Sequence, residues 1–455
     1  LGSLLCGFVF LPKLGMWGTF QVLTVLYLLV GICLPVGWKG VALISRFSAL
    51  GGLVLVLTWA DPSDFPVMGT SPSQPAAEIL EVWEESDCTV AVVEWAGGHR
   101  AITVNAAYAL GSTAAYQEQV DQARIPLFLF PETESICFIG LGTGISAGAA
   151  LGDAFPRVRR VVSCELSPAV IEAARKWIPE PMTGGVFTDP RSTVLAEDGR
   201  NYLMATAETF DMINADLFLP YRRGAGSLYS LDHYRTAAKR LNPGGVYVQW
   251  LPLYQITSDE FGVIGRTMLE AFDQVTMWRN NFNPGAEKVA LIGRMKSEAL
   301  AVPPAGDAEI MRRAVDGLNW VHTDADMARV EPESIAFFYA GNLSEARKLF
   351  ANYEINTDNR PIIEYETPKG FRKVAAYDEV IWCVGPKLLR WIARIFEAAP
   401  PESDPLWEGH PVEVLYQVRA GEAFHRSMVH AAKGEAEAAG QAWEAFQKYW
   451  RLGAR

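Results

Sequence analysis

The sequence predicts an α/β protein built around a doubly wound parallel sheet. The prediction depends on three features: apolar strands alternate with helical segments between residues 127 and 299, the first strand ends in glycines, and the second ends in an acid. This alternation is typical of parallel sheets covered by helices. We expect N-terminal transmembrane helices and a small β module before the sheet, and a C-terminal helical extension after it.

Composition divides the 455 residues into six expected segments. They are transmembrane helices (1–60), a proline-rich linker (61–77), a β-hairpin module (78–126), the sheet domain (127–299), a mixed extension (300–377) and a helical C-terminal region (378–455).

The first segment is apolar enough to enter a membrane. The run from Met16 to Trp38 carries no charge, and the run from Gly40 to Ala60 carries only Arg46. Each is long enough to cross a hydrocarbon layer of about 30 Å. Because Leu1–Leu11 is too short to cross, we expect this part to be truncated at its N-terminus. Membrane lipid is the partner expected for residues 1–60.

The next elements follow from alternation and turn signals. Residues 89–95 and 101–104 read as strands joined by the turn around Gly97 and Gly98, which indicates a hairpin. Sheet strands are expected at 136–139, 161–165, 193–196, 210–215 and 246–250, with helices from 146, at 168–177 and at 231–241.

The loop after the first sheet strand predicts a nucleoside site. Gly140, Gly142 and Gly144 let the backbone turn tightly and approach a ligand closely. Glu165, at the end of the second strand, is placed to accept hydrogen bonds from ribose hydroxyls. The Gly-x-Gly-x-Gly spacing differs from the dinucleotide fingerprint, which favours a ligand without phosphates: S-adenosylmethionine or its decarboxylated form.

A third strand end completes this prediction. Asp198, followed by Gly199, is placed to accept the adenine amino group. The alternative is an ordinary strand–helix turn in which both acids are solvated loop residues.

Other classes of function are disfavoured by composition. The net charge of −12 argues against nucleic acid as a partner. The six cysteines form no Cys-x-x-Cys pair and the six histidines show no ligand spacing, so no metal site is expected.

Several motifs, in order, resemble those of the spermidine/spermine synthases. They are Tyr116-Gln117-Glu118, the Gly140–Gly144 loop, Glu165, Asp198-Gly199 and the strand that ends in Asp216, followed by 226–230 and 241–245. With apolar helices in front, the chain is similar to the membrane-fused group described as fused major-facilitator/spermidine synthase proteins. Residues 357–364 resemble a segment of that group.

The resemblance implies a role for each matching residue. Asp216 would be the base that deprotonates the attacking amine, and Gln117 would lie beside the sulfonium arm of the donor. Tyr116 and Tyr229 would line the substrate pocket. The relatives also imply a possible homodimer. Two positions depart from the family pattern, because Thr143 and Leu219 stand where soluble members carry aspartates. The acceptor therefore stays open as a small-molecule amine or another nucleophile.

Three functions remain open. The first is a membrane-anchored aminopropyltransferase, the second an S-adenosylmethionine-dependent methyltransferase, and the third a non-catalytic transporter-like or assembly protein with a nucleoside-binding domain. Because adenosyl-sulfonium donors are cytosolic, we expect a multi-pass protein of the inner or plasma membrane with a cytoplasmic soluble domain.

Overall fold

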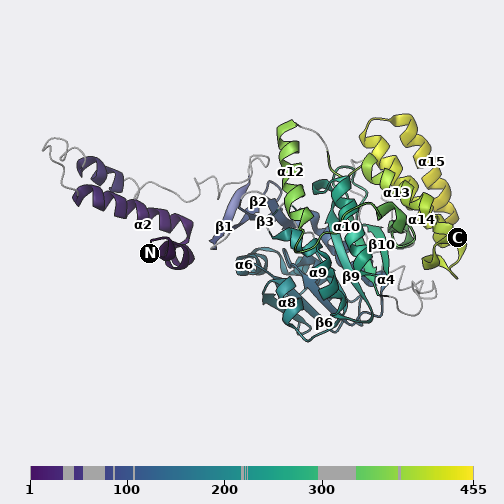
Figure 1. Cartoon of the computed structure of the whole chain (residues 1–455), viewed down its shortest axis with the longest axis horizontal. Helices are drawn as coiled ribbons and strands as arrows, with labels where there is room; N and C mark the ends of the chain where they lie inside the picture. Colours follow the sequence, from purple (N-terminus) through teal and green to yellow (C-terminus); the bar gives the residue numbers. More distant parts are fainter. Residues whose placement is uncertain are drawn as a thin grey trace. The chain divides into compact units, whose positions relative to one another are not determined.

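The computed structural model describes residues 2–33, 46–54, 77–85, 88–105, 108–216, 220, 222, 224–295, 335–377 and 381–453 (Figure 1). The chain forms two compact units. The first contains Leu1–Ala115 and Ser167–Pro179, and the second contains Tyr116–Leu166 and Glu180–Arg455.

The first unit contains a small antiparallel sheet. Its order is β1-β2-β3-β4, formed by Glu78–Glu84, Thr89–Glu94, Arg100–Val104 and Tyr108–Ser112. Gly97 and Gly98 have φ angles of 103° and 78°, which explains why glycine forms the turn between β2 and β3. Helix α6 (Pro168–Trp177) belongs to this unit. Helix α4 (Tyr116–Leu129), by contrast, belongs to the second unit, so the β module ends before residue 116 and not at residue 126 as expected from the sequence.

One apolar helix precedes this sheet. Helix α2 (Leu11–Cys33) is interrupted at Gly15, where φ is 69°. Among the described residues, its stretch Lys13–Gly31 is the one helix whose length and composition suit a membrane span. Of the second expected span, residues 46–54 are helical, and 40–45 and 55–60 lie outside the described residues. The structure therefore gives no support for several transmembrane helices.

The second unit is built on a large sheet. In its described part eight strands lie in the order β12-β10-β11-β9-β8-β5-β6-β7. In chain order they are β5 (Ser135–Ile139), β6 (Arg160–Glu165), β7 (Ser192–Ala196), β8 (Phe210–Ala215), β9 (Leu241–Pro252), β10 (Gln274–Arg279), β11 (Lys288–Arg294) and β12 (Tyr339–Asn342).

The prediction of a parallel sheet is correct for five of these strands and wrong for the rest. Strands β9, β8, β5, β6 and β7 are parallel, whereas β11, β10 and β12 pair antiparallel. The loop between β10 and β11 is too short for a crossover helix, so β11 has to run back along β10. The sheet is mixed.

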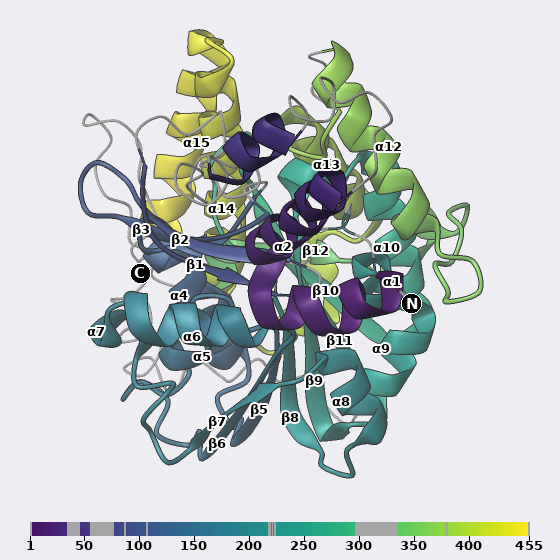
Figure 2. The same cartoon turned by 90° about the vertical axis from the view of Figure 1, so that its left-hand side faces the viewer.

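The strand order reverses beside β5. The chain first adds β6 and β7 on one side of β5 and then adds β8 and β9 on the other (Figure 2). In such sheets the ligand crevice lies at the carboxyl ends of the strands at this reversal. Ile136 to Ile139 are at most 3% exposed, which explains why this central strand is a continuous apolar run.

The described part of the second unit also contains helices. They are α4, α5 (Ile145–Ala149), α7 (Glu180–Thr183), α8 (Gly199–Ala205), α9 (Leu231–Ala238), α10 (Ser258–Ala271), α12 (Ile362–Tyr377), α13 (Pro386–Ala398), α14 (Val412–Ala432) and α15 (Ala436–Gly453). The last two form an antiparallel pair at the C-terminus (Figure 1). Phe337, Phe424 and Phe446 join that pair to the rest of the unit, with ring centroids 5.2–6.3 Å apart.

Candidate functional site

The glycine loop connects β5 to α5 through three left-handed residues. The φ angles of Gly140, Gly142 and Gly144 are 93°, 54° and 81°. A residue with a side chain would be strained in this backbone conformation. A Cβ atom on Gly144 would also lie 3.1 Å from Val186 Cγ1. The backbone conformation of the loop therefore explains why these three positions are glycine.

Glu165 fixes this loop from the neighbouring strand. It is the last residue of β6 and is 8% exposed. Its Oε2 accepts hydrogen bonds from the backbone N–H groups of Leu141 and Gly142, both at 3.1 Å. The second strand end and the glycine loop thus meet at one point of the sheet edge.

Asp198 follows β7 and begins helix α8. Its Oδ1 accepts from the N–H groups of Arg200 at 2.8 Å and Asn201 at 3.0 Å, so it is the helix N-cap. A Cβ on Gly199 would lie 2.7 Å from Ile139 Cγ2, so only glycine lets α8 approach β5 this closely. The structure therefore gives both residues a local structural role at the predicted position.

Asp216 lies directly after β8, beside the glycine loop. Its backbone N–H donates to Ile139 O, the last carbonyl of β5, at 3.1 Å, and its side chain is half-buried. Tyr229, in the turn η4 (Ala225–Tyr229), is completely buried. Burial raises the pKa of Tyr229, and the charges of Tyr254 and Asp216 raise it further. Asp216 and Tyr229 therefore lie within electrostatic reach of each other.

Tyr116 and Gln117 lie in the first turn of α4 and are half-buried. Gln117 Nε2 donates to Asp121 Oδ1 at 2.9 Å. Asp121 is completely buried, and this burial raises its pKa well above the usual range. This hydrogen bond of Gln117 lies within α4.

Other residues of α4 contact the glycine loop and were missed by sequence reasoning. Thr143 Oγ1 donates to Gln119 Oε1 at 2.5 Å, and Ser146 Oγ donates to Gln122 Oε1 at 3.4 Å. The side chains of Asn214 and Trp250 both donate to Gln122 O. The close spacing of glutamines in α4 was a signal for such a polar face.

Lys288 was also missed. It forms an ion pair with Glu118 of α4, and its Nζ lies 5.9 Å from the centre of the Tyr254 ring. Because the partners are 170 residues apart, no local pattern predicts this pair. Leu219, a position of the sequence argument, lies outside the described residues. Among those described, no three His, Cys, Asp or Glu side chains gather as metal ligands.

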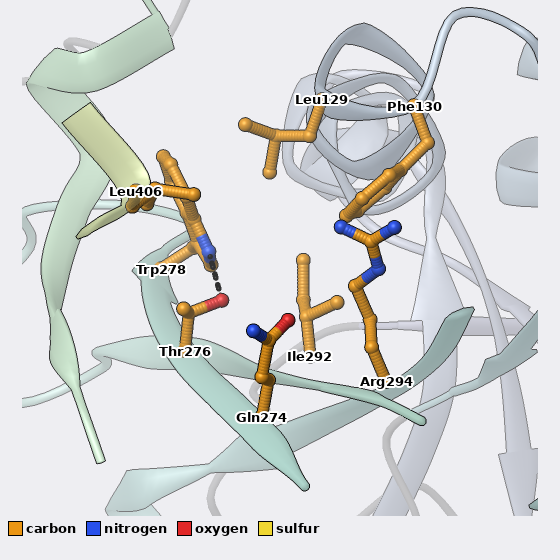
Figure 3. Close-up of a pocket in the computed structure, with 8 residues that line it drawn as sticks. All are labelled: Leu129, Phe130, Gln274, Thr276, Trp278, Ile292, Arg294 and Leu406. Atoms are coloured by element: carbon orange, nitrogen blue, oxygen red, sulfur yellow. Dashed lines mark hydrogen bonds between the residues drawn. The ribbon is translucent and has the colours of Figure 1, made fainter. Parts of the chain in front are cut away.

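The end of the sheet away from the glycine loop, where the parallel strands begin, contains a small cavity. The cavity is lined by the first residue of β10, Gln274, and the last of β11, Arg294, together with Trp278 (Figure 3). The Arg294 guanidinium lies 5.2 Å from the centre of the Phe130 ring. Trp278 Nε1 donates to Thr276 Oγ1 at 2.8 Å. None of the residues proposed from the sequence lines this cavity.

Comparison with known proteins gives the site a context. Residues 114–279 match the family model described as "Spermine/spermidine synthase domain". The polyamine aminopropyltransferase of Corynebacterium efficiens is 29% identical over 283 residues, which are 60% of this chain and 53% of that protein. That of Aeropyrum pernix is 34% identical over 120 residues, 26% of this chain and 38% of that protein.

A solved structure resembles part of the chain. The crystal structure of spermidine synthase from Thermotoga maritima has a TM-score of 0.43 and 18% identity, covering 54% of this chain and 81% of that one. The chain spans about half or less of the length of the two curated relatives. Their names give no support for the membrane-fused group. The stretch from residue 114 to residue 279, which holds the glycine loop and all three strand-end acids, is similar to spermine/spermidine synthase domains.

Proposed function

We propose that the chain is an aminopropyltransferase in which an amine attacks an adenosyl-sulfonium donor, with Asp216 as the base. The main support is the position of Asp216. Its backbone N–H donates to the last carbonyl of β5, next to the glycine loop and at the reversal of strand order. The match of residues 114–279 and the names of the relatives support the same reaction class.

The chemistry requires a proton acceptor at this point. An alkylammonium group has a pKa near that of lysine, about 10.4, and has no lone pair until its proton leaves. Asp216 would take that proton while the nitrogen attacks the carbon next to sulfur. The new C–N bond forms as the C–S bond breaks, and its electron pair stays on sulfur as a neutral thioether, methylthioadenosine. The sulfonium supplies the leaving group, so the step needs no metal.

The remaining site residues would bind the donor, decarboxylated S-adenosylmethionine. Glu165 would hold the ribose hydroxyls, and Asp198 the adenine amino group. Gly140, Gly142 and Gly144 leave room for the nucleoside, because no side chain projects from the loop at these positions. Gln117 would turn from Asp121 toward the sulfonium arm, and Tyr116 and Tyr229 would line the acceptor side.

The direct test is incubation of the purified chain with decarboxylated S-adenosylmethionine and putrescine, with detection of methylthioadenosine by mass spectrometry. We expect nucleoside product that depends on both substrates. Absence of product across a panel of primary amines would reject aminopropyl transfer and would favour a non-catalytic role.

Methyl transfer from intact S-adenosylmethionine is the second candidate. It is favoured by Thr143, whose hydroxyl bonds to the neutral Gln119 where soluble family members place a carboxylate. A neutral loop does not repel the donor's own carboxylate. Calorimetric titration with both donors separates the candidates, since tighter binding of the intact donor supports methyl transfer and tighter binding of the decarboxylated one opposes it.

We also propose that α2 anchors the chain in the inner or plasma membrane, with the sheet domain in the cytoplasm. Its support is the exposure of apolar side chains such as Phe20, Tyr27 and Val30, which are 50%, 78% and 57% exposed. Retention in the membrane pellet after alkaline carbonate washing is expected, and release into the supernatant would contradict it. A homodimer stays a prediction that light scattering can test.

A further inference from the structure

Residues 356–364, named here the clamp, contact the turn that follows Asp216. That turn, residues 224–230, is named the acceptor loop. Glu364 Oε1 accepts from the N–H of Gly224 at 2.6 Å, and its Oε2 accepts from that of Gly226 at 3.0 Å. A Cβ on Gly226 would lie 2.6 Å from the backbone nitrogen of Glu364. The two backbones therefore approach as closely as glycine permits.

Asn356 connects the clamp to the acceptor loop and to the residue that follows the loop. It is completely buried, its Nδ2 donates to Gly226 O at 3.0 Å, and its carbonyl accepts from Leu231 N at 2.8 Å. Its Oδ1 accepts from Ile363 N at 3.2 Å, which fixes the start of α12. One side chain thus ties the clamp to itself and to the loop.

Asp358 links the loop to the donor side of the site. Its Oδ1 accepts from Ser230 Oγ at 2.8 Å, and its other oxygen forms an ion pair with Arg200. Arg200 in turn donates to Ser227 O at 3.2 Å and lies two residues after Asp198. Burial alone would raise the pKa of Asp358, but the hydrogen bonds from Arg200 and Ser230 outweigh it and lower that pKa.

Between these anchors lies Tyr229, the buried ring on which the charge of Asp216 acts. Glu364 holds the start of its turn and Asp358 holds the residue after it. The clamp lies outside the stretch 114–279 that matches the family model, although the acceptor loop lies inside it. A segment about 130 residues downstream therefore fixes one wall of the site.

We propose that Glu364 and Asp358 are positioning residues for the amine acceptor, holding the acceptor loop and Tyr229 in place against Asp216. This inference rests on the proposed transferase function. A small displacement of a positioning element costs about 10- to 100-fold in rate when it misplaces the reacting groups. Loss of the Glu364 carboxylate should affect the acceptor more than the donor, because the two hydrogen bonds described for it go to Gly224 and Gly226 in the turn that follows β8.

The test compares Glu364→Gln and Asp358→Asn with a matched control. Glu366→Gln alters an exposed carboxylate of the same helix that is paired with Lys369, outside the clamp. For Glu364→Gln we expect kcat/KM for the amine to fall about 10- to 100-fold. The dissociation constant of the donor, measured by calorimetry, should stay within about twofold, and the control should match the wild type.

Hydrogen–deuterium exchange gives a readout that does not need turnover. Amides of residues 224–231 should exchange faster in both clamp variants, whereas those of 140–147 should not. Unchanged exchange at 224–231 overturns the inference even if no amine is a substrate, in which case the proposed function fails separately. Faster exchange with unchanged kcat and KM also overturns it, because the clamp would then serve stability alone. Asp358 is 40% exposed, so its variant keeps the test available if Glu364→Gln folds poorly.

Discussion

Asp211 and Asp216 lie at opposite ends of β8, and the two aspartates have different surroundings. Asp211 Oδ2 accepts from Glu134 N, Ser135 N and Ser135 Oγ at 2.8–3.0 Å, and its Oδ1 accepts from Asn242 Nδ2 at 2.7 Å. At the carboxyl end of β8, Asp216 lies beside the glycine loop, and its charge helps to raise the pKa of buried Tyr229. Asp211 thus joins β8 to the start of β5, whereas Asp216 lies at the carboxyl ends of the parallel strands, where sheets of this kind form their ligand crevice.

The largest expected effect separates these two roles. Asp216→Asn removes the proposed proton acceptor without changing size, so kcat for amine transfer should fall about 10²- to 10⁴-fold. Steady-state assays measure this, with circular dichroism and thermal melting as controls for folding. A variant with wild-type kcat would show that Asp216 is not the base.

At the amino end of β8, loss of the carboxylate should lower stability but leave kcat unchanged. Asp211→Ala leaves two backbone N–H groups without their acceptor, which should lower the free energy of unfolding by about 2 kcal/mol, a modest figure because the side chain is only partly buried. Below its melting temperature the variant should keep wild-type kcat. A loss of kcat without a loss of stability would contradict the structural role of Asp211 and its contrast with Asp216.

Buried His233 makes the stability of the folded chain depend on pH. Burial, then the charge of Arg200, lowers the pKa of this histidine from 6.5 to about 3. Tyr247 donates to Gln249 Oε1 at 3.0 Å, so His233 Nε2 is the donor in its 3.1 Å contact with Tyr247. Because its pKa is about 3, the ring is neutral in the folded chain above that pH.

The sign of the pH effect follows. Between about pH 6.5 and 3 the unfolded chain binds a proton at His233 that the folded chain does not, so this contribution to stability is complete above pH 6.5 and declines below it. We expect stability to fall by about 1.4 kcal/mol per pH unit there from this group. Thermal unfolding between pH 5 and 7.5 measures it, and His233→Gln should reduce the slope by that amount. Equal slopes in both proteins would contradict the prediction.

The smallest expected effect concerns Asp198, which is both a helix cap and a proposed ligand to adenine. Asparagine caps helices as well as aspartate does, so Asp198→Asn should leave the melting temperature unchanged. The lost carboxylate should weaken donor binding about tenfold, corresponding to about 1.4 kcal/mol. Calorimetric titration measures this, and unchanged affinity would leave Asp198 as a cap alone.

Sequence patterns predicted the central parallel strands and the glycine loop better than the rest of the sheet. Ile136–Ile139 and Val161–Glu165 were readable as strands because buried parallel strands are continuous apolar runs, and the glycines of the loop have the positive φ angles that demand glycine. The antiparallel strands β10 to β12 were missed. Residues 288–294 are as apolar as a parallel strand, and their direction depends on the short connection that precedes them.

Contacts between distant segments could not be predicted from local patterns. Glu118 with Lys288 and Gly226 with Asn356 are separated by 170 and 130 residues. Glu118, Lys288 and Asn356 each look like an ordinary charged or polar surface residue in the sequence, and Gly226 looks like an ordinary turn glycine. The role of Asp198 as a cap was equally hidden, because the same position at a strand end suits a ligand contact and a helix start.

Strand β12 has a practical consequence for work with shorter forms of the protein. It is contributed by Tyr339–Asn342, beyond the stretch that matches the family model, and it pairs with the outer side of β10. A chain cut soon after residue 294 would expose the unpaired backbone groups of β10, and such open edges promote aggregation. Expression trials of the sheet domain should therefore extend beyond residue 342, since an insoluble shorter product would reflect a lost edge strand and not an unstable fold.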